Sequence, residues 1–198
     1  MRKNVFIVLF GASALGILLI YVWLQMNGNS DRQSYEGASP YLPVSFKYPV
    51  SWMLREDQGK IDHYSQAIIL APKKPGWPYT AAFVVRGSPL KSARGRFETP
   101  EELKQNFVSH LYKDPRVLKE STLRLKGTSS IDLTVSYTFL PIRHKGFNAQ
   151  PVPVKNRILF AQNNGILYEL SYSADEREFE SHSAEFSRLL KSLRFVTT

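Results

Sequence analysis

The chain has 198 residues, no cysteine, 43% hydrophobic residues and a formal net charge of +9 at pH 7. This composition excludes a disulfide framework and a thiolate metal site, and it is typical of a folded domain rather than a disordered chain. Arg2 and Lys3 carry two of the positive charges and leave +7 on the residues that follow. A basic surface of this kind favours anionic lipid head groups or acidic protein surfaces as partners.

Residues 5–24 form an apolar run that contains no charged side chain. A helix of about 20 residues spans roughly 30 Å, which is the thickness of the hydrocarbon core of a bilayer. The run therefore predicts one transmembrane helix that satisfies its own backbone hydrogen bonds. Because Arg2 and Lys3 precede it, the positive-inside rule leaves residues 1–4 in the cytoplasm and exports the rest. The expected location is a bacterial inner membrane or a photosynthetic membrane, with the C-terminal part in the periplasm or lumen.

A cleaved signal peptide is the alternative interpretation of the same run. The apolar stretch is longer than a usual signal core, and no A-x-A-like cleavage site follows it, so we favour an uncleaved anchor. Within the run, Ala12 and Gly16 form a small-xxx-small pair that could let a helix of another membrane protein approach closely. Export also makes nucleic acid an unexpected partner, although it is anionic.

Residues 25–40 are small and polar, and they predict a flexible linker before a folded domain at 41–198. Alternating or apolar runs predict strands near 44–48, 62–71 and 79–86. A helix is expected to begin at Thr99-Pro100-Glu101-Glu102, which has the form of a capping box with proline at the first helical position, and to stop at Asp114-Pro115.

The second half of the chain predicts four more strands and a second helix. Strands are expected at 117–126 and 131–139, followed by a hairpin of 158–162 and 166–173 around Asn164-Gly165, which suits a type I′ turn. The capping-box pattern Ser173 to Glu176 predicts a helix over 174–192, and Phe195 could start a short final strand. The expected fold is α+β, with a mainly antiparallel sheet flanked by helices.

Three segments resemble the PsbP/Mog1-like family: Phe46-Lys-Tyr-Pro49-Val-Ser-Trp52, the run from Asn164 to Ala174, and the run from Phe186 to Phe195. The resemblance extends over about 41–196. It implies a domain that binds or stabilises other proteins, since the family includes extrinsic subunits and assembly factors of photosynthetic complexes as well as envelope lipoproteins. This chain departs from the family by its transmembrane helix, which favours a resident of a membrane complex.

The sequence contains no recognisable catalytic motif. It has no cysteine nucleophile and no G-x-S-x-G elbow, and its four histidines lack zinc-site spacing. Asp62 and His63 are neighbours on a predicted strand, so their side chains should point to opposite faces. We expect no enzyme activity, no metal and no cofactor; a hydrolase is the least favoured reading.

Two long loops concentrate basic side chains, and long loops in a compact domain are often functional. The first loop carries Arg86, Lys91, Arg94 and Arg96, and the second carries Arg143, Lys145, Phe147, Lys155 and Arg157. If functional, they should dock on acidic protein loops or anionic head groups, with Phe147 as an apolar anchor. The alternative is that these basic loops are ordinary solvated surface without a partner.

These observations predict a non-catalytic, membrane-anchored accessory subunit that stabilises a membrane protein complex or assists its assembly on the periplasmic or lumenal side. A photosynthetic or electron-transport complex is the expected kind, on the family resemblance alone. The alternative is an envelope binding module that captures a small ligand or peptide between sheet and helix.

Overall fold

The computed structural model describes residues 31–37, 39–58, 65–74, 81–111, 113–140 and 150–196. The residues from Ser34 onward belong to one compact unit, which is the subject of this section. The predicted span 5–24, with Ala12 and Gly16, lies outside the described residues. Among the helices that are described, none has the length and apolar character needed to cross a bilayer.

The chain alternates long antiparallel strands with two α-helices. In order, the elements are β1 (Arg32–Glu36), β2 (Val44–Pro49), β3 (Trp52–Gln58), β4 (Gln66–Pro72), β5 (Ala82–Pro89), the 3-10 helix η1 (Lys91–Ala93), α2 (Pro100–Ser109), β6 (Lys113–Leu125), β7 (Thr128–Phe139), β8 (Val152–Asn163), β9 (Ile166–Asp175), α3 (Phe179–Ser192) and β10 (Arg194–Phe195). One sheet has the order β3-β4-β5-β9-β8-β7-β6, and a smaller one has the order β1-β2-β10. Every strand pair with a described register is antiparallel, so the predicted α+β class is confirmed.

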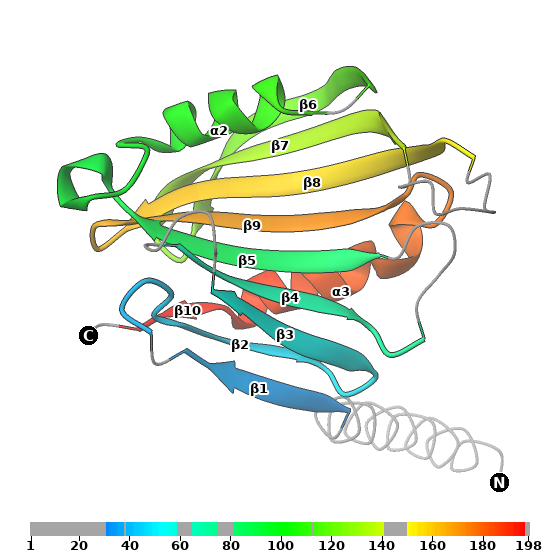
Figure 1. Ribbon diagram of the computed structural model, residues 1–198. Helices are drawn as coiled ribbons and strands as arrows, with labels where there is room; N and C mark the ends of the chain where they lie inside the picture. Colours follow the sequence, from blue (N-terminus) through cyan, green and yellow to red (C-terminus); the bar gives the residue numbers. More distant parts are fainter. Residues whose placement is uncertain are drawn as a thin grey trace, which may run out of the picture. The chain divides into compact units, whose positions relative to one another are not determined.

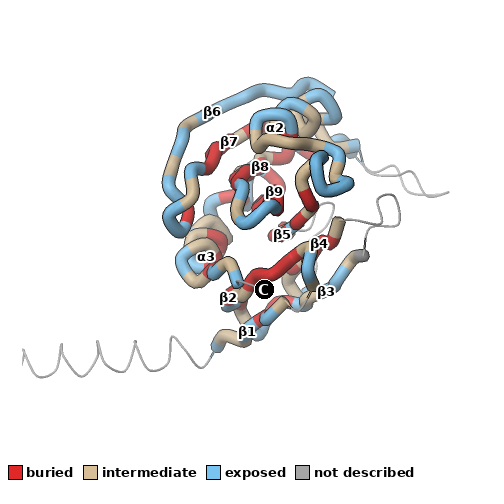
Figure 2. The backbone as a smooth tube through the Cα atoms, turned by 90° about the vertical axis from the view of Figure 1, so that its left-hand side faces the viewer, coloured by how far each residue is buried: buried red, intermediate tan, exposed pale blue. Residues whose placement is uncertain are grey.

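The seven-stranded sheet is the middle layer of the unit, and it is covered differently on its two faces (Figure 1). Helix α2 covers one face over β7 and β8, where Leu103 packs on Leu133 and Phe160. Helix α3 and the small sheet cover the other face, where Phe186 packs among Phe83 and Tyr172. Figure 2 shows the buried residues concentrated on the central strands between these layers.

Strand β9 is buried on both faces because it lies in the middle of the sheet. Tyr168, Leu170 and Tyr172 point toward α3 and the small sheet, whereas Leu167 joins the cluster beneath α2. This explains why the segment around Asn164-Gly165 is strongly apolar. The turn itself was predicted correctly in kind: Asn164 and Gly165 have φ values of 47° and 76°, the left-handed conformation that a type I′ turn requires.

Two strands occur where none was predicted. β1 lies within the segment 25–40 that was expected to be a linker, and β3 follows immediately after the turn at Val50 and Ser51. The sequence of β1 is polar, and of Ser34 to Glu36 only Tyr35 is buried. β1 forms although its local pattern is weak, because it pairs with β2. Tyr35 also stacks on Phe46, with ring centroids 5.1 Å apart.

The two predicted helix starts had different outcomes. At α2, the Thr99 hydroxyl accepts a hydrogen bond from Glu102 N at 3.2 Å, as the capping box predicts, although the helix already ends at Ser109. The start of the last helix at Ser173 to Glu176 was wrong. Ser173 and Asp175 continue strand β9 through pairing with β8, and α3 begins at Phe179. The pairing of β8 with β9 holds this segment in a strand, so the capping-box pattern does not start a helix there.

Candidate functional site

Two of the predicted partner-binding arginines are used inside the fold. Arg86 on β5 faces Glu169, its register partner on β9, with 3.3 Å between Nη1 and Oε2. Arg157 on β8 binds Asp132 on β7 through two hydrogen bonds of 2.9 and 2.8 Å. Both carboxylates are almost completely buried, so each arginine compensates a charge that the sheet would otherwise hold unpaired. The hydrogen bonds that Arg157 donates to Asp132 also raise the pKa of Arg157 above its usual value.

Lys155 has a structural role as well. Its Nζ lies 3.1 Å from Glu180 Oε1 and 4.4 Å from the centre of the Phe179 ring. Both partners lie in the first turn of α3, so Lys155 ties β8 to that helix by an ion pair and a cation–π contact. Its side chain is three-quarters buried, which leaves little of it for a partner.

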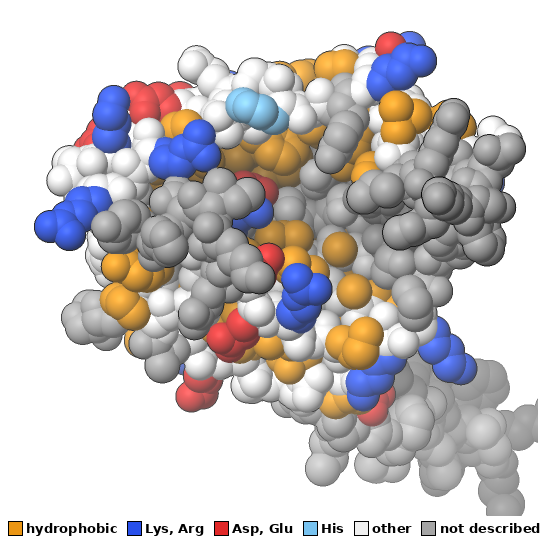
Figure 3. Space-filling view, viewed as in Figure 1, with side chains coloured by type: hydrophobic (Ala, Val, Ile, Leu, Met, Phe, Trp, Pro, Cys, Tyr) orange, Lys and Arg blue, Asp and Glu red, His pale blue; other side chains and the backbone are white. Residues whose placement is uncertain are grey.

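The remaining described residues of the predicted site form the η1 corner, defined by Lys91, Arg94 and Arg96. All three are exposed, on the connection between β5 and α2. The connection is held by Lys91 N donating to Phe97 O at 2.7 Å and Gly95 N donating to Leu90 O at 2.8 Å. Within the described part of the chain, Lys91, Arg94 and Arg96 form no ion pair. Figure 3 shows basic side chains gathered near η1 and the start of α2.

The described residues of the predicted site do not form one surface. The η1 corner follows Pro89, which pairs with Ile166 at the start of β9, whereas Lys155 pairs with Ala174 near its end. A strand of this length separates the two positions by roughly 25 Å or more. Arg143, Lys145 and Phe147 lie outside the described residues, and their role stays a prediction.

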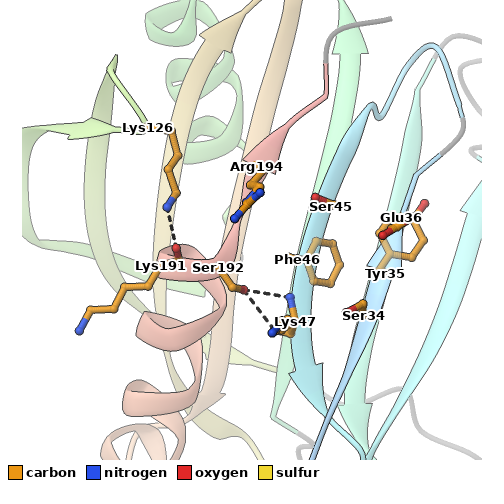
Figure 4. A pocket seen from close by; sticks show the side chains of 10 residues that line it. All are labelled: Ser34, Tyr35, Glu36, Ser45, Phe46, Lys47, Lys126, Lys191, Ser192 and Arg194. Carbon is orange, nitrogen blue, oxygen red and sulfur yellow. Dashed lines mark hydrogen bonds between the residues drawn. The ribbon is translucent and has the colours of Figure 1, made fainter. Parts of the chain in front are cut away.

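A more concentrated basic site lies elsewhere, in a groove of about 500 Å³ (Figure 4). We call it the basic groove; its lining residues are Ser34, Tyr35, Glu36, Ser45, Phe46, Lys47, Lys126, Lys191, Ser192 and Arg194. It contains four cations and one carboxylate, Glu36, and so carries three net positive charges. None of the four cations forms an ion pair with another described residue.

Three connections build the basic groove from distant parts of the chain. Arg194 pairs with Ser45 where β10 joins β2. Lys47 N donates to the Ser192 hydroxyl at 2.9 Å, which attaches the end of α3 to the small sheet. Lys126, in the turn between β6 and β7, donates from Nζ to Lys191 O at 2.6 Å and so caps the C-terminus of α3. Figure 4 shows Lys126 directed at the carbonyl of Lys191 and Ser192 directed at Lys47, while the Lys191 side chain points away from these contacts.

Sequence analysis missed the basic groove because its cations are far apart in the chain. Lys47, Lys126 and Lys191 are separated by at least 65 residues in the chain, and they are brought together by the β10–β2 pairing and by the contacts of Ser192 with Lys47 and of Lys126 with Lys191. The segment Lys191-Ser-Leu-Arg194 is basic, but the pattern gives no indication that Lys126 lies beside it. Knowing that the final strand pairs with residues 44–45 would have placed Arg194 near Lys47.

The described histidines have packing or surface positions. The ring of His182 lies edge-on to Trp52, with centroids 5.5 Å apart, and His110 is exposed at the end of α2. Among the residues that the structure describes, no three potential metal ligands are grouped together.

No protein-family model matches the sequence, and no curated protein sequence matches it either. The fold is nevertheless that of PsbP/Mog1-like proteins, as the resemblance in the sequence implied. LpqN of Mycobacterium tuberculosis, which is involved in cell envelope biogenesis, matches with a TM-score of 0.53 and 14% identity over 84% of this chain and 91% of its own.

Two further structures show the same fold. Cyanobacterial PsbP (CyanoP) from Synechocystis sp. PCC 6803 matches with a TM-score of 0.51 and 15% identity, over 83% of this chain and 92% of its own. A Bacteroides thetaiotaomicron protein matches with a TM-score of 0.50 and 13% identity, over 84% of this chain and 49% of its own. At these identities the likeness extends to the fold alone.

Proposed function

We propose that this protein is a non-catalytic accessory subunit, held by its helix at 5–24 on the periplasmic or lumenal side of a membrane. There it binds an acidic surface of an integral membrane protein complex and stabilises that complex or assists its assembly. The observation that carries the proposal is the η1 corner, whose three cations are exposed and are not neutralised by any described carboxylate.

The η1 corner is suited to a partner because its cations form no ion pair with a described residue. Arg86 and Arg157 compensate buried carboxylates, so replacing either arginine should destabilise the sheet. Lys91 and Arg94 face no described carboxylate. The loop that carries them is well ordered by backbone hydrogen bonds, and Arg96 lies over the Phe97 ring at 5.6 Å. An ordered, basic loop loses little conformational entropy when it docks.

The predicted anchor strengthens any such contact. A domain tethered to the membrane by a short segment meets a membrane partner at high effective concentration, so weak contacts can suffice. The two named proteins of the same fold, LpqN and CyanoP, are in keeping with an envelope or complex-associated role. A bacterial inner membrane or a photosynthetic membrane is the proposed location, and an electron-transport or photosynthetic complex is the proposed kind of partner.

Photocrosslinking in the native membrane tests this proposal. A photoreactive residue replacing Arg94 in the full chain should crosslink to one membrane protein, and the yield should fall at high salt because the contact is electrostatic. The matched control places the same residue at Lys74, an exposed cation just after β4. Crosslinks from position 74 alone, or none from position 94, would contradict docking through the η1 corner.

A second candidate, an envelope binding module, is favoured by one buried atom. Asn156 Oδ1 is fully buried and accepts no hydrogen bond from the residues that the structure describes. By the alternation of β8, Asn156 lies on the same sheet face as Ile158 and Phe160, which pack beneath α2. A ligand that donates a hydrogen bond would satisfy this oxygen. Native mass spectrometry of the full chain tests it: a bound small molecule that an Asn156→Leu variant loses supports the binding module, and an unliganded wild-type chain contradicts it.

A further inference from the structure

We propose that the basic groove binds the phosphate group of an anionic phospholipid in the leaflet that the domain faces. This inference rests on the membrane anchor of the proposed function, but it concerns a different surface from the η1 corner. It assigns a ligand class to residues that no sequence pattern had singled out: Lys47, Lys126, Lys191 and Arg194.

The charge balance of the groove favours an anion. The four cations and Glu36 leave three net positive charges around one opening. The C-terminus of α3 also lies here, and its dipole contributes only about half a negative charge. Lys126 already donates to the carbonyl of Lys191, which reduces that contribution further. The local field is therefore positive, and an anion entering the groove replaces repulsion among cations by attraction.

The size and the lining fit a head group better than a protein surface. A volume of about 500 Å³ lies within the usual range of small-ligand pockets, roughly 300–1,000 Å³. The hydroxyls of Ser34 and Ser45 add donors beside the ammonium and guanidinium groups. Phosphate oxygens accept hydrogen bonds from such groups, and the planar guanidinium of Arg194 can offer two at once. Acyl chains would stay in the bilayer, outside the groove.

The chain itself keeps the groove close to the bilayer. Ser34 lines the groove and follows the end of the predicted span, Leu24, by about ten residues. Even a fully extended segment of that length reaches at most about 35 Å. A segment of this length lets the groove reach the lipid surface, and within about one Debye length of that surface anionic head groups attract basic residues. A soluble anion has no comparable reason to be enriched there.

Hydrogen exchange of the full chain in lipid nanodiscs tests the inference without any protein partner. Discs of phosphatidylcholine alone are compared with discs that also contain phosphatidylglycerol. Exchange in β2 and at the junction of α3 with β10 should be slower only when phosphatidylglycerol is present. Replacing all four groove cations by glutamine should abolish this slowing. A control with Lys73, Lys74, Lys113 and Arg116 replaced by glutamine removes four exposed cations that do not line the groove and should retain the slowing.

Two further arms separate the alternatives. Because Lys126→Gln also removes the cap of α3, the double variant Lys191→Gln/Arg194→Gln keeps that bond and should weaken the lipid effect by about fivefold for each cation removed. Inorganic phosphate added to phosphatidylcholine discs should not reproduce the slowing. Full slowing with free phosphate, equal loss in the control variant, or no response to phosphatidylglycerol would each overturn the inference. None of these readouts depends on the η1 corner or on a protein partner.

Discussion

Arg157 on β8 binds Asp132 on β7 through one edge of its guanidinium group, with Nε donating to Oδ1 at 2.9 Å and Nη2 donating to Oδ2 at 2.8 Å. The Asp132 side chain is 9% exposed and that of Arg157 30% exposed, so the pair lies at the boundary of the interior. A bidentate pair in this position holds two strands together, so the Nε–Nη2 edge of Arg157 is not open to a partner. The arginine that sequence analysis assigned to docking belongs to the fold.

Replacing Arg157 by alanine should destabilise the domain by about 2 kcal/mol, because the carboxylate of Asp132 would remain buried without its partner. For a domain of this size, such a loss lowers the melting temperature by roughly 4–8 °C. Thermal unfolding of the full chain in mild detergent, followed by circular dichroism, measures it. Arg94→Ala is the control and should leave the melting temperature unchanged. An equal melting temperature for Arg157→Ala would show that the ion pair contributes nothing.

Tyr172→Phe should destabilise the domain by about 1 kcal/mol, since it removes one buried hydrogen bond. The hydroxyl of Tyr172 donates to Phe179 O at the start of α3. Burial raises the pKa of Tyr172 well above its usual value, so this donor keeps its proton through the physiological range. Tyr48→Phe is the matched control, because no hydrogen bond from the Tyr48 hydroxyl occurs within the described residues. Similar melting temperatures for both variants would refute the assignment.

The ion pair of Asp175 and Arg177 should make part of the stability depend on acid pH. Arg177 donates to Asp175 through Nε at 2.9 Å and Nη2 at 2.6 Å, and these bonds lower the pKa of Asp175 below its usual value. A carboxyl with a lowered folded-state pKa stabilises the fold above its unfolded value, about 3.9, and loses that effect as the pH falls further. The melting temperature of Arg177→Gln should therefore lie below that of the wild type at pH 7, and the gap should close below about pH 4. A gap that stays constant across this range would contradict the pairing.

The elements that sequence analysis found are those with a strong local pattern. The alternation in β7, the capping box of α2 and the Asn164-Gly165 turn all follow from side chains within a few residues of one another. The elements it missed or misplaced depend on tertiary pairing. β1 and β3 have weak patterns and exist because β2 and β4 pair with them, while the false cap at Ser173 is overridden by the hairpin of β8 and β9.

The site was predicted less well than the fold, for a related reason. Counting basic residues along a loop cannot tell a cation that faces a buried carboxylate, such as Arg86, from one that faces water, such as Lys91. Nor can it join Lys126 to Arg194, which become neighbours of one groove only through the packing of α3 and β10. Both distinctions require the register of the sheet, which the local sequence does not contain.

The absence of cysteine from the whole chain makes the predicted topology directly testable. A single cysteine at Lys74→Cys should react with a membrane-impermeant maleimide in intact spheroplasts, because the positive-inside rule exports the domain. A cysteine at Asn4→Cys should react only after the membrane is broken. Labelling of Asn4→Cys in intact spheroplasts, or protection of Lys74→Cys, would reverse the orientation assumed in the proposed function.

The central claim is that the chain is a resident subunit of a membrane complex that docks through the η1 corner. The most direct measurement is purification of the tagged full chain from its own membrane in mild detergent at low salt, followed by quantitative mass spectrometry. We predict a membrane protein partner in near-stoichiometric amount, reduced about tenfold or more in a Lys91→Glu/Arg94→Glu variant and unchanged in a Lys73→Glu/Lys74→Glu variant. A wild-type chain that purifies without any partner, or a partner retained equally by both variants, would contradict the claim.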